Sequence, residues 1–79
     1  MYAYINGVLA DSDNQYEVVE ANGVGYQVFV PASVFRNLPP RGERVKLFTY
    51  LHLREDCQEL YGFLEKDEKQ FFEKLISVS

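Results

Sequence analysis

Two adjacent carboxylates, Glu55 and Asp56, stand where two runs of β-forming residues meet. Arg54 precedes this pair and Cys57 follows it, so a cation and a thiol flank the acids. Carboxylates at such a position repel anions and attract cations. Acidic residues also serve at hairpin tips simply as soluble turn formers, and the spacing alone favours that simpler interpretation.

The other residues that could do chemistry form no recognisable constellation. Cys57 is the single cysteine and has no base or second thiol near it in sequence, which argues against a nucleophilic or redox function. His52 is the single histidine, so a zinc site is not expected. Asp11 and Asp13 lack the glycine and the distal glutamate of a calcium loop. We therefore expect no metal, no cofactor and no catalytic residue, and an enzyme is the least expected class.

The composition is that of one small acidic domain. The chain has 79 residues, of which 47% are hydrophobic and 15% aromatic, enough to build a core without disulfides. Twelve acidic residues against eight basic ones give a net charge of -4, so the totals indicate no basic surface for phosphates. No segment has the pattern of a secretory signal or of a membrane span, which predicts a soluble cytoplasmic protein.

Short β-rich runs separated by turn residues occupy most of the chain. Asn22-Gly23 is a strong hairpin signal, and because no helix follows it, we exclude a phosphate-binding glycine loop. Pro31 and Pro39-Pro40 confine one helical turn, for which Ser33 is a candidate N-cap. The strands are expected at residues 2–10, 16–21, 24–30, 43–54 and 59–64. This pattern predicts an all-β fold with a C-terminal helix, built on a five-stranded Greek-key OB-fold barrel.

Apolar spacing predicts the core of the barrel and the final helix. We expect the following side chains to be mostly buried: Val28, Val30, Val45, Leu47 and Leu60. The period then changes, and residues 64–79 are expected to form an amphipathic helix. Phe71 and Leu75 of this helix should pack against the barrel or a neighbouring subunit.

Five short segments together resemble the N-terminal domain of the RuvA family, whose members bind Holliday junctions. Each segment alone occurs in many proteins, but here all five stand in the order and spacing typical of that family, counted from Met1. The segments are Asn22-Gly23-Val24-Gly25-Tyr26, Leu38-Pro39-Pro40, Phe48-Thr49-Tyr50, Arg54-Glu55-Asp56 and Leu60-Tyr61-Gly62-Phe63.

The resemblance implies an accessory DNA-binding subunit that is not itself an enzyme. In this family a homotetramer holds Holliday junction DNA open as a square, and the RuvB motor drives branch migration in recombination and repair. The resemblance also implies that residues 1–63 are the OB-fold domain. Residues 64–79 would begin a helix-hairpin-helix domain, which this chain lacks together with the C-terminal domain that contacts RuvB.

Within the implied site, Glu55 and Asp56 form an acidic pin at the centre of the junction. Arg54 either touches a phosphate beside the pin or pairs with the neighbouring carboxylates. Two other functions stay open. A general single-strand-binding OB module would need a basic groove lined by exposed aromatic rings. A pure oligomerisation domain would use the barrel edge and the final helix as subunit contacts.

Overall fold

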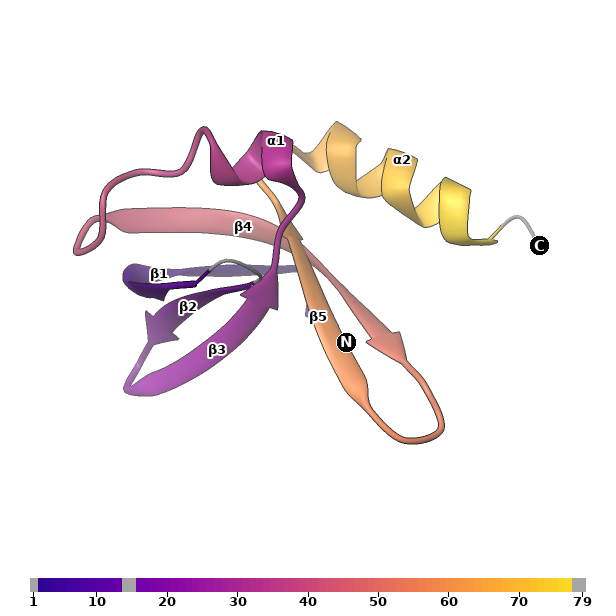
Figure 1. The fold of residues 1–79 in the computed structure, drawn as a ribbon, viewed down its shortest axis with the longest axis horizontal. Coiled ribbons are helices and arrows are strands. Elements are labelled where there is room, and N and C mark those ends of the chain that lie inside the picture. The colour runs from indigo at the N-terminus through magenta and orange to yellow at the C-terminus, as the bar shows by residue number, and fades with distance from the viewer. Residues whose placement is uncertain (1, 14–15, 78–79) are drawn as a thin grey trace.

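The computed structural model describes residues 2–13 and 16–77 (Figure 1). A β-barrel forms most of the chain, and one longer helix lies beside it. The elements in chain order are β1 (Tyr4–Ser12), β2 (Tyr16–Ala21), β3 (Val24–Phe29), α1 (Ala32–Phe35), β4 (Arg44–Leu53), β5 (Gln58–Phe63) and α2 (Lys66–Ser77).

The strands close into a barrel in the order β1-β2-β3-β5-β4. β1 pairs antiparallel with both β2 and β4, and its ladder with β2 contains a register shift between Leu9 and Asp11. β3 and β5 run parallel and are joined through the pair Phe29 and Tyr61. This closed barrel with its C-terminal helix confirms the predicted OB-fold.

Two local features explain how the chain turns so tightly. Asn22 and Gly23 have φ values of 53° and 82°, the left-handed pair that a two-residue hairpin between β2 and β3 requires. At Gly7 a Cβ atom would collide with the carbonyl oxygen of Glu20, so only glycine lets β2 approach β1 this closely. The hairpin signal in the sequence is therefore confirmed.

Nine buried apolar side chains form the core of the described part of the chain. They include four of the five residues predicted to be buried, and Leu47 and Val28 are both 0% exposed. Val30 is the exception, because β3 ends at Phe29 and leaves it half-buried at the barrel's edge. The core is compact around Leu47, since a Cβ on Gly62 would lie 3.2 Å from its Cδ1 atom.

Both helices form within the segments that the sequence predicts, but two of their details differ. Pro31, not Ser33, occupies the N-cap of α1, and no side chain caps that helix. On α2 it is Phe72 that packs on the barrel, with ring centroids 5.1 Å from those of Tyr61 and Phe63. Successive helical residues are rotated by about 100°. Phe71 is therefore turned to solvent at 64% exposure, and Leu75 is likewise 59% exposed, so neither packs on the barrel. The alternative expectation, that they contact a neighbouring subunit, stays a prediction.

Among the residues that the structure describes, one carboxyl group is almost fully buried. Glu17 on β2 is 1% exposed, and neither of its oxygens has a hydrogen-bond partner. Burial away from water raises the pKa of this carboxyl above its ordinary value. The nearby Ser12 side chain opposes this rise, and the negative charges of Asp11 and Asp13 add to it. An ionised Glu17 is therefore costly in the folded state.

Leu47→Ala should lower the free energy of unfolding by about 2 to 5 kcal/mol, because it leaves a cavity in the centre of the core. Leu53→Ala is the matched control on the same strand, since Leu53 is 62% exposed. Urea denaturation of both variants measures the difference. Similar losses for the two would contradict the barrel's described packing.

Glu17→Gln should make stability less dependent on pH. The folded state holds the Glu17 proton more tightly than the unfolded chain, so the parent loses stability as pH rises from the ordinary value of 4.5 through the raised pKa. The free energy of unfolding of the variant, relative to that of the parent, should consequently increase with pH across this window. Denaturation midpoints between mildly acidic and neutral pH check this, and a constant difference would argue against a neutral Glu17.

Candidate functional site

The predicted site residues lie at the end of a two-stranded arm formed by β4 and β5. Figure 1 shows this hairpin extending away from the other strands. The ladder runs from Phe48 and Phe63 to Leu53 and Gln58. The backbone N–H of Arg54 then donates to the carbonyl of Cys57 at 2.8 Å, which leaves Glu55 and Asp56 as the two-residue loop.

Both loop carboxylates are exposed and unengaged. Neither Glu55 nor Asp56 has a hydrogen bond or an ion pair with another residue in the described part of the chain. Their charges are consequently available to whatever approaches the tip. The hairpin ladder behind them fixes where the two carboxylates sit, since each arm strand is held by the other.

Arg54 is held against the side of the arm and does not reach toward the tip. Its Nη2 atom lies 3.0 Å from Oε1 of Glu59 on β5. The hydroxyl of Tyr61 donates to the same oxygen at 3.1 Å. Burial raises the pKa of that hydroxyl, and the hydrogen bond to Glu59 adds to the rise. Arg54 thus pairs with a neighbouring carboxylate, namely Glu59, while 52% of its side chain stays exposed.

The remaining candidates from the sequence do not join this site as chemical groups. The His52 ring packs against Tyr50 and Tyr61, with centroid separations of 6.2 and 6.4 Å, as expected for a structural histidine. Cys57 is a free, exposed thiol. Within residues 2–13 and 16–77, no three His, Cys, Asp or Glu side chains gather closely enough to hold a metal ion.

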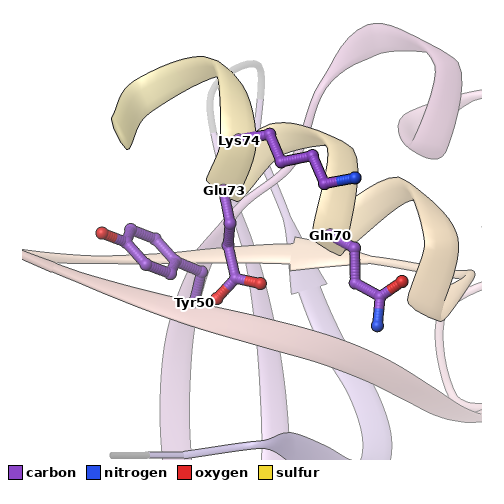
Figure 2. Close-up of a pocket in the computed structure, with 4 residues that line it drawn as sticks. All are labelled: Tyr50, Gln70, Glu73 and Lys74. Atoms are coloured by element: carbon purple, nitrogen blue, oxygen red, sulfur yellow. The ribbon is translucent and has the colours of Figure 1, made fainter. Parts of the chain in front are cut away.

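A groove between β4 and α2 was not predicted. It has a volume of about 590 Å³ and is lined by Tyr50, Gln70, Glu73 and Lys74. Figure 2 shows the Glu73 carboxylate beside the Tyr50 ring, while Gln70 and Lys74 extend along the other side. The sequence could not place this groove, because the angle between α2 and the barrel depends on tertiary packing at Phe72.

Sequence reasoning also missed the buried carboxyl of Glu17 and the position of Lys46, whose ammonium lies 4.3 Å from the centroid of the Tyr4 ring. For Glu17 the sequence did contain a signal, because strand alternation places it on the same face as Val19.

In the described segments, no helix is long and apolar enough to cross a membrane.

Comparison with known proteins gives a consistent result. The family model described as RuvA N terminal domain matches residues 1–62. A protein from Acetivibrio thermocellus is 48% identical over 79 residues, which is 100% of this chain and 39% of that protein. One from Solibacter usitatus is 49% identical over 79 residues, 100% of this chain and 40% of its own length.

A third relative, from Caldanaerobacter subterraneus subsp. tengcongensis, is 43% identical over 79 residues, covering 100% of this chain and 42% of its own length. Each of these three proteins is named as a Holliday junction branch migration complex subunit RuvA. The chain spans about two fifths of the length of these relatives. With the family model covering most of its residues and the relatives matching all of them, the chain belongs to the RuvA family, as its N-terminal domain.

Proposed function

We propose that this domain acts in a branch migration complex, where Glu55 and Asp56 form an acidic pin at the centre of a Holliday junction. The observation that carries the proposal is the exposed, unpaired carboxylate pair at the end of the β4–β5 arm. The names of the relatives support the choice of DNA substrate.

The pin works by repulsion. A carboxylate about 5 Å from a phosphate in water costs on the order of 1 kcal/mol, and more where water is excluded. Duplex that runs straight across the tip meets this penalty, whereas a junction whose strands part there avoids it. Selection against the wrong substrate is a recognised source of specificity. In a homotetramer, four such tips would meet and the penalties would add.

The pairing of Arg54 supports this reading of the tip. Because Glu59 neutralises Arg54, the guanidinium does not cancel the charges of Glu55 and Asp56. The tip therefore keeps its net negative charge. At 52% exposure Arg54 can still meet a phosphate beside the arm, so a phosphate contact is compatible with its pairing.

The rest of the assembly is proposed on the family relationship. Tight phosphate binding would belong to a helix-hairpin-helix domain, and ATP hydrolysis to a RuvB motor that binds elsewhere. Helix α2 follows the residues matched by the family model, which supports the proposal that it begins the next domain. This domain itself contributes no catalytic residue.

Changing Glu55 and Asp56 to Asn in the full-length protein should leave the fold intact and shrink the preference for a junction over duplex. Asn is close in size and accepted in turns, so only the charges are lost. Duplex affinity should rise severalfold, because the penalty on the wrong substrate disappears. Gel shift at one fixed salt concentration gives both affinities.

The matched control is Glu43→Gln with Asp67→Asn, which removes two exposed carboxylates from other parts of the surface. This control should keep the parent's ratio of junction to duplex affinity. An unchanged ratio in the Glu55 and Asp56 variant would mean that the pair only forms a turn. The domain would then serve assembly alone.

A further inference from the structure

The outward-facing residues of β4 carry an unusual sequence of side chains. From Arg44 to Tyr50 burial alternates along the strand, so every second residue there points away from the core. None of these outward residues is acidic, although the chain as a whole has a net charge of -4. They are Arg44, Lys46, Phe48 and Tyr50.

The first half of this row continues onto β1. Tyr4 pairs with Phe48, and Asn6 pairs with Lys46. The Lys46 ammonium lies 4.3 Å from the ring centroid of Tyr4 and 5.2 Å from that of Phe48. Arg44 donates to the side-chain oxygen of Asn6 at 3.3 Å. We call these five residues of β1 and β4 the outer strip.

The cations of the outer strip lack carboxylate partners. Among the described residues, neither Arg44 nor Lys46 takes part in an ion pair, whereas Arg41 pairs with Asp11 and Arg54 with Glu59. Aromatic faces and an amide oxygen hold the two cations in place. The strip is thus a local positive surface on an acidic protein.

Carboxylates border this positive surface on two sides. In the register, Val8 lies opposite Arg44 on one side and Glu20 on the other, so an acidic residue borders the strip there. At the other end the groove under α2 presents Glu73 beside Tyr50 (Figure 2). Between these carboxylates, the segment of β4 from Arg44 to Phe48 is where the local charge favours an anion.

We propose that the outer strip binds a short stretch of single-stranded nucleic acid. Arg44 and Lys46 are two residues apart, about 7 Å along the strand, which is close to the repeat of phosphates in an extended single strand. Tyr4 is 52% exposed, so much of its ring is open to a base. Rings beside cations form the stacking platform by which single strands are held.

An unpaired strand suits this surface better than a duplex. A base stacks on Tyr4 or Phe48 only when its face is free, and in a duplex the faces are covered by neighbouring base pairs. Two phosphate contacts give a shallow salt dependence, with a slope of about -1.4 on logarithmic axes. The inference does not rest on the pin, because the strip lies at the opposite end of β4 from Glu55 and Asp56.

The test is an NMR titration of this chain with a short oligothymidylate and, separately, with a short duplex. We expect saturable shifts at the amides of the outer strip with the single strand and markedly weaker binding to the duplex. Tyr4→Leu should reduce single-strand affinity about fivefold or more. Lys46→Ala should weaken it and flatten the salt slope by about 0.7.

Two controls match these changes in chemistry. Phe71→Leu removes a ring that is 64% exposed on α2, and Lys66→Ala removes an exposed cation at the start of that helix. Both should bind like the parent, and the dispersion of each spectrum reports whether the variant is folded. Equal affinity for duplex, or equal effects of Lys46→Ala and Lys66→Ala, would overturn the proposal. If Lys46→Ala weakens single-strand binding but Tyr4→Leu does not, the proposal is also overturned, because the binding is then nonspecific electrostatic attraction.

Discussion

Strand β4 belongs both to the barrel wall and to the projecting arm, and closing the barrel fixes where its two ends point. Its first half pairs with β1 and its second half with β5. The core around Leu47 holds this strand without a disulfide, and the free thiol of Cys57 is exposed outside the core. Core packing and the strand ladders, without a covalent cross-link, therefore determine the geometry of the tip and of the outer strip.

Charge is divided along this one strand. Arg44 and Lys46 stand at its beginning without carboxylate partners, whereas Glu55 and Asp56 stand just beyond its end without cationic partners. Arg54, placed between these regions, is neutralised by Glu59. The total charge of -4 hides this arrangement, since it counts all groups equally wherever they lie. The beginning of the strand can consequently attract phosphates, while the loop beyond its end repels them.

Much of the fold followed from local patterns, while the contacts that depend on packing did not. Asn22-Gly23 and the strand alternation act locally, so the hairpin and most of the core were predicted correctly. Which side of α2 faces the barrel depends on the docking angle, and Phe72 replaced the expected Phe71. The ion pair of Arg54 joins two strands, and sequence spacing left its partner open.

The salt dependence of substrate preference in the full-length protein tests the acidic pin most directly. Gel shifts would give the ratio of junction to duplex affinity at several salt concentrations, for the parent and for the variant without the two carboxylates. If repulsion at Glu55 and Asp56 sets the preference, the parent's ratio should fall toward that of the variant as salt screens the charges. If the parent and the variant have the same ratio of junction to duplex affinity even at low salt, the account is contradicted.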